Sequence, residues 1–176
     1  MFTKKKNKQF KFSSILGDHI ILNKGQFLTT DTHLENKIVG LYFSSSWCPP
    51  CQSFTPDLIK FYNNYHQDNN FEIVLIPYHE GNLSPFKKYF SKMPWPSHFL
   101  KGKKDNVDIE NLRKRYKCIS VPTLIFINSQ GTIIHKIIGH QQRNEIINNP
   151  TSMSFIKKRE KVIVTKKTMK KNLKDK

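Results

Sequence analysis

Two cysteines separated by two prolines, in the motif WCPPC at residues 47–51, constrain this chain more than any other feature. An apolar run at residues 38–44 precedes the motif, and apolar residues recur at helical spacing from Phe54 through residue 67 or so. The motif is therefore expected between a buried strand and a helix. At a helix start, free backbone N–H groups and the helix dipole stabilise a thiolate, which makes Cys48 the expected nucleophile. Cys51, one turn later, is within reach to resolve a mixed disulfide.

Pro49 and Pro50 suit this position, because the first turn of a helix needs no N–H donors and proline presets the helical φ. Cys-x-x-Cys is also a spacing found in zinc sites, but such a site needs a second pair of ligands. The only other cysteine, Cys118, stands alone, and the histidines form no His-x3-His pair. We therefore expect a redox dithiol and no metal.

The length of 176 residues and the 37% hydrophobic content fit one globular domain, expected at residues 12–155. No apolar run approaches 18 residues, so no membrane span is expected. The basic N-terminus does not resemble a secretory signal, because Lys11, Ser13 and Ser14 interrupt the apolar stretch that follows. Three cysteines make no disulfide framework, which favours a reducing compartment: the cytoplasm, with the nucleus as a second location.

The net charge of +17 is concentrated in the two ends of the chain. Residues 1–11 hold five lysines and no acidic residue, and residues 151–176 hold ten basic and two acidic residues, so the middle keeps +4. We expect a disordered basic arm at 1–11 and a solvated basic tail at 156–176. Lysine outnumbers arginine 26 to 4, whereas nucleic-acid recognition relies on arginine, so nucleic acid is not the expected partner. Binding of the tails to an anionic surface stays open.

The rest of the chain alternates strand-like and helical patterns. Strands are expected at 20–22, 26–28, 71–78, 123–128 and 132–138, and helices at 83–92, 108–117 and 142–148. Pro56 is expected to kink the helix after the cysteines, and residues 93–96 cannot be regular helix. This order predicts an α/β fold with a mixed central sheet flanked by helices. A right-handed crossover joins the strands at 38–44 and 71–78, so residues after Tyr78 should lie near the cysteines.

Several motifs in sequence order resemble the tryparedoxins and nucleoredoxins of the thioredoxin superfamily, over about residues 15 to 155. They are YFSxSWCPPC at 42–51, FTP at 54–56, NFExVLI at 70–76, KMPW at 92–95 and VPTLI at 121–125. The resemblance implies a thioredoxin fold that needs no metal, flavin or nucleotide.

The resemblance also implies roles for single residues. Cys48 would attack, Cys51 would resolve, and Trp47 would shield the dithiol. A cis Pro122 would expose the backbone of Val121 to pair with a substrate peptide. Trp95 is expected to pack beneath the site.

Two departures from the family pattern bear on proton transfer. The pattern after the second central strand is Trp-Asp-Glu, whereas this chain has Tyr78-His79-Glu80. Thioredoxins bury an acidic residue where this chain, like tryparedoxins, has Tyr42. Glu80 is therefore the candidate to relay a proton from Cys51, with His79 as a modulator, and the alternative is that both are exposed loop residues.

Cys118 follows Arg115, Tyr116 and Lys117. Basic neighbours would lower its pKa if it were exposed, but a lone cysteine is more often a small buried residue, and burial is expected here.

The sequence thus predicts a monomeric thiol-disulfide oxidoreductase that reduces protein or peroxidase disulfides through a Cys48–Cys51 cycle. A low-molecular-weight thiol or a reductase would donate the electrons. One alternative is a non-catalytic, redox-sensitive interaction module of the nucleoredoxin type. Another is a thioredoxin-like reductase of an exported compartment.

Overall fold

The computed structural model describes residues 10–98, 108–139, 142–148, 150 and 153–156. Its strands are β1 (His19–Ile21), β2 (Phe27–Thr29), β3 (Ile38–Ser44), β4 (Phe71–Pro77), β5 (Ser97–His98), β6 (Thr123–Ile127) and β7 (Ile133–Ile138). Its helices are α1 (Ser13–Leu16), α2 (Thr30–Leu34), α3 (Pro49–Asn69), α4 (Leu83–Phe90), α5 (Ile109–Arg115) and α6 (Arg143–Ile147).

The strands form one mixed sheet in the order β2-β1-β5-β4-β3-β6-β7. The central pair β3 and β4 is parallel, while β6 runs antiparallel to β3 and pairs with β7 in an antiparallel hairpin. Every residue of β4 is buried, as expected for a central parallel strand covered on both faces. The predicted mixed sheet flanked by helices is confirmed.

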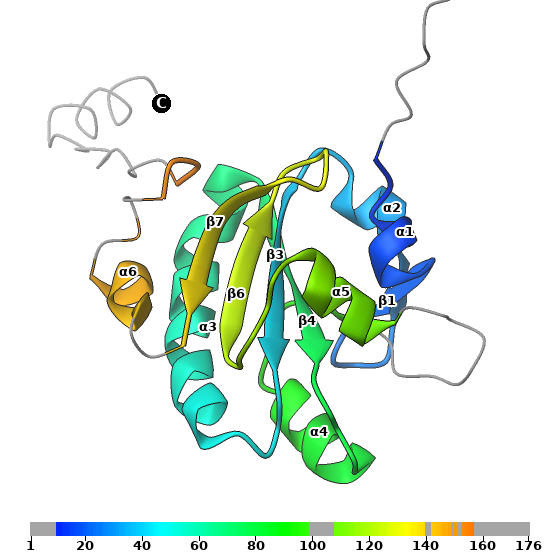
Figure 1. The fold of residues 1–176 in the computed structure, drawn as a ribbon, viewed down its shortest axis with the longest axis vertical. Helices are drawn as coiled ribbons and strands as arrows, with labels where there is room; N and C mark the ends of the chain where they lie inside the picture. The colour runs from blue at the N-terminus through cyan, green and yellow to red at the C-terminus, as the bar shows by residue number, and fades with distance from the viewer. Residues whose placement is uncertain (1–9, 99–107, 140–141, 149, 151–152, 157–176) are drawn as a thin grey trace, which may run out of the picture.

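Alternate residues of the central strands enter two hydrophobic layers, one on each face of the sheet. Tyr42, Ile73 and Leu75 pack with apolar residues of α3, α4 and α6, whereas Leu41 and Val74 pack with those of α1, α2 and α5. Figure 1 shows α3 and α6 on one side of the sheet and α5 on the other. β3 is thus buried between the two layers, and it leads directly into the WCPPC motif.

Gly40 in the middle of β3 allows a close approach between β3 and β6. A Cβ atom at this position would lie 2.9 Å from the ring of Phe126 on the neighbouring strand. Glycine therefore lets a large aromatic residue pack across β3, at the strand that positions the dithiol.

The structure adds three short elements that the sequence did not predict: α1, α2 and β5. With two to five residues each, they are too short to show a hydrophobic period. α3 is a single helix that continues through Pro56, where the sequence predicted a kink.

Residues on the arm and tail sides of the predicted domain boundaries contact the fold, and the boundaries themselves stay a prediction. Phe10, assigned to the arm, packs its ring on Phe12 and Arg115, and Ile156, assigned to the tail, is buried. Residues 1–9 of the predicted arm and residues 157–176 of the predicted tail lie outside the described residues. Within the described part of the chain, no helix is long and apolar enough to cross a membrane.

Candidate active site

Cys48 and Cys51 lie at the start of α3 and are joined as a disulfide, with their Cα atoms 5.2 Å apart. Cys48 is the residue before the first helical turn, and Pro49 and Pro50 occupy the first two helical positions. The backbone N–H of Cys51 donates a hydrogen bond to Sγ of Cys48, at 3.3 Å. A free N–H group at the helix start thus points at the Cys48 sulfur, which is the arrangement that stabilises a thiolate there.

The two sulfurs differ in their access to solvent. Cys51 is completely enclosed, while Cys48 keeps 4% of its surface exposed. Cys48 thus retains a small accessible surface, whereas Cys51 retains none.

The loop before β6 lies against the Cys48 sulfur. The bond between Val121 and Pro122 is cis, as the resemblance implied. The carbonyl oxygen of Val121 is 4.0 Å from Sγ of Cys48. Backbone groups for strand-like pairing with a substrate therefore lie beside the nucleophile.

Glu80 is bound to the segment that leads into the WCPPC motif. Its carboxylate accepts hydrogen bonds from the backbone N–H of Ser46 at 2.5 Å, from the Ser46 hydroxyl at 2.6 Å and from the Ser45 hydroxyl at 3.0 Å. The alternative that Glu80 is an exposed loop residue is therefore wrong. These hydrogen bonds do not involve Cys51, and the relay role of Glu80 stays a prediction.

Trp47 and His79 connect the same two loops. The indole Nε1 of Trp47 donates to the carbonyl oxygen of His79 at 3.1 Å, although 57% of the Trp47 surface is exposed. The His79 ring is exposed and lies 3.8 Å from a carboxylate oxygen of Glu110. The crossover prediction is confirmed, because residues after Tyr78 contact the motif. The imidazole itself faces Glu110 and solvent.

A buried network of hydroxyl groups lies directly below the dithiol. The Thr55 hydroxyl donates to the carbonyl oxygen of Cys51 at 2.8 Å and contacts the hydroxyls of Tyr42 and Tyr89 at 2.9 and 2.6 Å. Tyr89 also contacts the Ser44 hydroxyl at 2.7 Å. Burial raises the pKa of Tyr42 well above its ordinary value, so its hydroxyl is neutral at pH 7.

Sequence reasoning did not single out Thr55, Tyr89 or Ser44 for such a network. Their hydroxyls meet only because α3, α4 and β3 converge at this point, and the sequence carries no local signal for that convergence.

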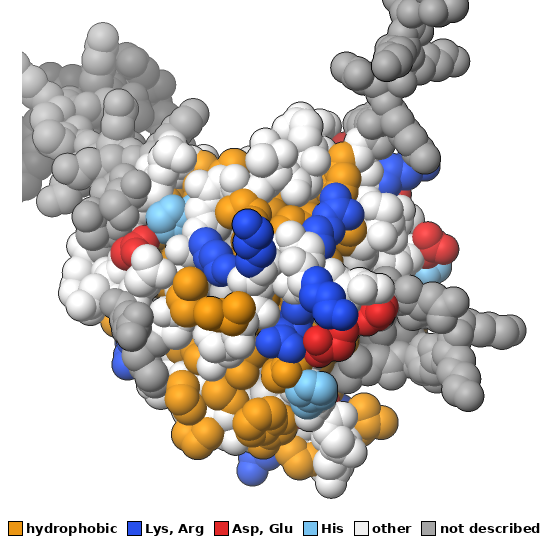
Figure 2. Space-filling model, in the orientation of Figure 1, with side chains coloured by type: hydrophobic (Ala, Val, Ile, Leu, Met, Phe, Trp, Pro, Cys, Tyr) orange, Lys and Arg blue, Asp and Glu red, His pale blue; other side chains and the backbone are white. Residues whose placement is uncertain are grey.

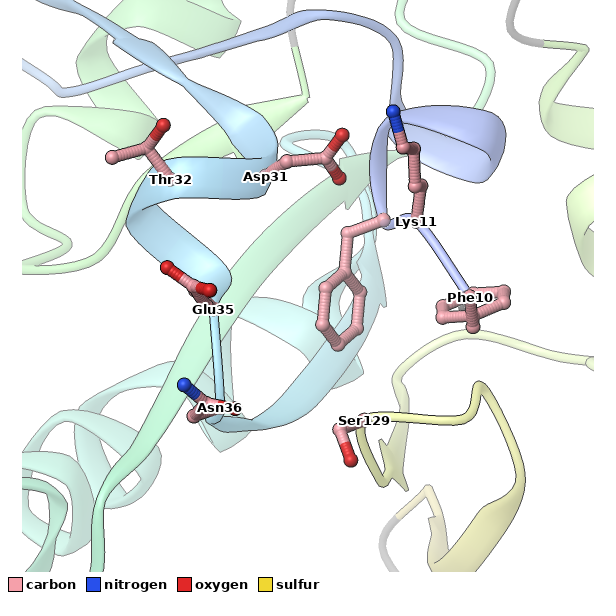
Figure 3. A pocket seen from close by; sticks show the side chains of 8 residues that line it. Phe10, Lys11, Asp31, Thr32, Glu35, Asn36 and Ser129 are labelled. Carbon is pink, nitrogen blue, oxygen red and sulfur yellow. The ribbon is translucent and has the colours of Figure 1, made fainter. Parts of the chain in front are cut away.

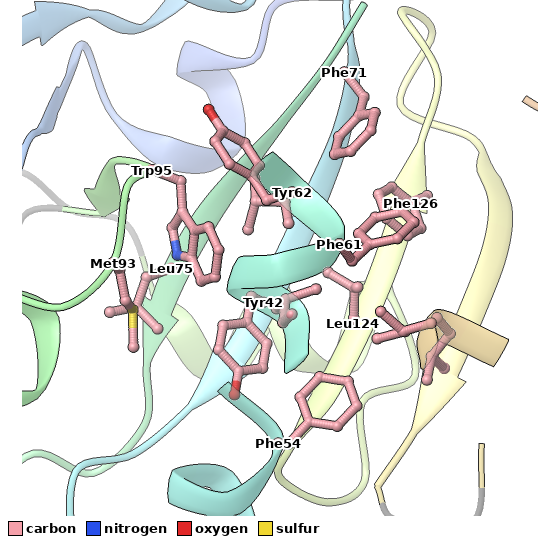
Figure 4. Packing of buried hydrophobic residues seen from close by; sticks show 14 of the residues in the cluster. Tyr42, Phe54, Phe61, Tyr62, Phe71, Leu75, Met93, Trp95, Leu124 and Phe126 are labelled. Atoms are coloured by element: carbon pink, nitrogen blue, oxygen red, sulfur yellow. The ribbon is translucent and has the colours of Figure 1, made fainter. Parts of the chain in front are cut away.

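Trp95 is completely buried and packs as predicted. Its ring meets those of Tyr42 and Tyr62 edge to face, with centroids 6.2 and 5.4 Å apart, and Figure 4 shows it next to Met93 in the same layer. Its Nε1 has no hydrogen-bond partner among the described residues. Trp95 therefore supports the buried layer that contains Tyr42.

Cys118 is buried, as predicted, and its thiol lies 3.5 Å from the carbonyl oxygen of Ser120. Burial raises the pKa of this thiol, while the nearby cations Arg113 and Lys136 oppose the shift without cancelling it. Cys118 is therefore a poor nucleophile at neutral pH.

A pocket between α1, α2 and the turn after β6 is lined by Phe10, Lys11, Asp31, Glu35 and Ser129, among others (Figure 3). Glu35 comes shortly before β3 begins, so this pocket lies at the opposite end of the sheet from the dithiol. Among the described residues, no group of three or more metal-ligating side chains comes together.

Comparisons with known proteins agree with this geometry. A family described as thioredoxin-like matches residues 36–133. Tryparedoxin of Trypanosoma brucei brucei is 43% identical over 122 residues, which cover 69% of this chain and 80% of that protein. Human nucleoredoxin is 34% identical over 145 residues, or 82% of this chain, which spans only 31% of that longer protein.

A solved structure of tryparedoxin II complexed with glutathionylspermidine superposes with a TM-score of 0.66 at 32% identity. The match covers 78% of this chain and 90% of the tryparedoxin chain. The residues that match the thioredoxin-like family include both cysteines of the WCPPC motif. The chain belongs to the thioredoxin-like family, as a thiol-disulfide oxidoreductase similar to tryparedoxins and nucleoredoxins.

Proposed function

We propose that this protein reduces disulfides of client proteins, peroxidases among them, with Cys48 as the attacking and Cys51 as the resolving thiol. The observation that carries the proposal is the asymmetry of the pair. Sγ of Cys48 accepts the N–H of Cys51 at the helix start, lies 4.0 Å from the carbonyl oxygen of Val121, and belongs to a residue that keeps 4% of its surface exposed, while Cys51 is fully enclosed. A thiol with no accessible surface, such as that of Cys51, cannot meet a client first, but it is well placed to attack the sulfur of its neighbour.

The reaction runs in two exchange steps. The Cys48 thiolate attacks one sulfur of the client disulfide, forming a mixed disulfide while the other client sulfur leaves as a thiolate. Cys51, having lost its proton, then attacks Sγ of Cys48. The second client thiol is released, and Cys48 and Cys51 become a disulfide. Two electrons have passed from the dithiol to the client.

A small thiol then returns the dithiol to its reduced state. Glutathione or a conjugate of it is the donor class we propose, because the related tryparedoxin II forms a complex with glutathionylspermidine. Two donor thiols supply the two electrons and leave as a disulfide. We further propose that the protein works as a monomer in the cytoplasm, and also in the nucleus.

Substitution of one cysteine at a time tests the assignment. With an insulin-type disulfide as client, Cys51→Ser should still attack and then accumulate as a mixed disulfide on Cys48. Cys48→Ser should neither reduce the client nor retain it. Trapping by Cys48→Ser in place of Cys51→Ser would reverse the two roles.

A second candidate is a redox-dependent interaction module, since the chain is also similar to nucleoredoxin. If the protein reduces a disulfide substrate over multiple turnovers with glutathione as donor, this result supports the oxidoreductase function. If the dithiol is oxidised once and no further turnover follows, this result supports the interaction module.

A further inference from the structure

A group of basic side chains lies on the sheet face that α5 covers. We call it the cationic band: Lys114 and Arg115 at the end of α5, Lys117 just after it, and Lys136 on β7. The ammonium group of Lys136 donates to the carbonyl oxygen of Lys117 at 2.5 Å, so the two segments are in contact. Figure 2 shows Lys and Arg side chains gathered in the middle of this face, with apolar surface below them.

The band is not neutralised by its surroundings. Among the described residues, none of its four members forms an ion pair, whereas the neighbouring Arg113 is paired with Glu110 at 3.1 Å. Outside the band, the described residues hold nine basic and ten acidic side chains. The four charges of the band therefore account for the net positive charge of the described residues.

The band adjoins the loop that lies against the nucleophile. Lys117 precedes Val121 by four residues, which span at most about 14 Å of chain. Ile119 lies between them and is 80% exposed, and Trp47, next to Cys48, is 57% exposed. A segment lying along this loop would thus meet apolar side chains next to the sulfur and positive charge further out, within one to two Debye lengths at physiological salt.

We propose that this surface binds the segment of a client protein that carries the disulfide, and that it selects clients with acidic side chains near that disulfide. The inference rests on the proposed function, because the occupant is the disulfide substrate. Charge complementarity argues for an acidic partner. Attraction of this kind acts mainly on the rate of encounter, and it weakens as salt is added.

The test uses reduced full-length protein and three synthetic peptides with the same internal disulfide, flanked by Glu, Lys or Ser residues. Second-order rate constants are measured in single turnovers. The Glu peptide should react on the order of 3- to 10-fold faster than the Lys peptide at low ionic strength, and the ratio should fall toward one at high salt. Equal rates for the Glu and Lys peptides would overturn the inference.

Two sets of variants locate the effect. Lys114→Glu combined with Lys117→Glu should abolish or reverse the preference, and Lys114→Gln with Lys117→Gln should weaken it if the first pair folds poorly. Lys24→Glu is the control, because Lys24 follows β1 near the opposite edge of the sheet. If Lys24→Glu changed the ratio of the Glu and Lys rate constants as much as the band variants do, or if the band variants left this ratio unchanged, the preference would come from the net charge or from the tails. Either result would contradict the proposal. Reduction of the Ser peptide by every variant tests the proposed function separately.

Discussion

The carboxylate of Glu80 accepts two hydrogen bonds from Ser46, one from its backbone N–H and one from its hydroxyl, at 2.5 and 2.6 Å. Ser46 lies two residues before the nucleophile, so Glu80 fixes the backbone that leads into the dithiol. Buried hydrogen bonds to an ionised group contribute roughly 1.5–3 kcal/mol each to the stability of the folded protein. Since Glu80 is only half-buried, its contribution lies toward the lower end of that range.

Glu80→Gln replaces one acceptor oxygen by a donor and should destabilise the loop by about 1–2 kcal/mol. If Glu80 acts by positioning, attack by Cys48 and resolution by Cys51 should both slow, with an unchanged pH profile. If it also relays a proton, the mixed disulfide should persist longer, in a pH-dependent manner. Single-turnover kinetics separate the two steps. Ser46→Ala, which removes one of the hydrogen bonds and no carboxylate, should reproduce only the positioning effect.

His79→Asp tests whether the departure from the family pattern acts on the nucleophile. An aspartate close to the Cys48 sulfur would oppose formation of its thiolate. In the structure the imidazole is exposed and faces Glu110, so solvent and salt screen the added charge. The pH midpoint of Cys48 alkylation should therefore move by less than about half a unit, equivalent to ~0.7 kcal/mol. A shift of a full unit would show that the two side chains interact more directly.

Tyr89→Phe tests the hydroxyl network beneath the dithiol. The substitution leaves the ring in place but removes the buried partner of both Thr55 and Ser44. The free energy of unfolding in urea should fall by about 1–2 kcal/mol. Tyr65→Phe is the matched control, because no hydrogen bond is made by the Tyr65 hydroxyl within the described residues. Equal losses in the two variants would mean that the network adds nothing to stability.

Cys118 should be nearly inert to alkylation at pH 7 in the folded, reduced protein. Because burial raises its pKa, less thiolate is present at pH 7 than in a free cysteine, and among the described residues no helix N-terminus stabilises the thiolate as at Cys48. Peptide mapping after limited reaction with iodoacetamide should find Cys118 labelled only in urea. Labelling in buffer at a rate similar to that of Cys48 would contradict the buried placement.

The sequence predicted those parts of the fold whose signal is local. The apolar runs at 38–44 and 71–78 predicted the bounds of β3 and β4 to within one residue. These strands are easy to recognise because both are covered on two faces and are therefore apolar along their length. β5, with two residues, pairs with β4 only at Leu75 and Ser97 and leaves no pattern in the sequence.

The candidate site likewise contains features with a local signal in the sequence and features without one. The spacing of Cys48 and Cys51 revealed the dithiol and its helix start, and the resemblance supplied the cis Pro122. The binding of Glu80 to Ser46 depends on how two loops meet after parallel strands. The crossover rule predicted that these two loops lie close together, but it did not predict which side chains would form hydrogen bonds.

The central claim is that Cys48 is the nucleophile of a redox dithiol. The most direct test is to treat the reduced wild-type protein with limiting iodoacetamide at pH 7 and to map the first label by mass spectrometry. We predict that the label is on Cys48, because its sulfur accepts the N–H of Cys51 at the helix start, while Cys51 is fully enclosed. First labelling of Cys51, with Cys48 unmodified, would contradict the account.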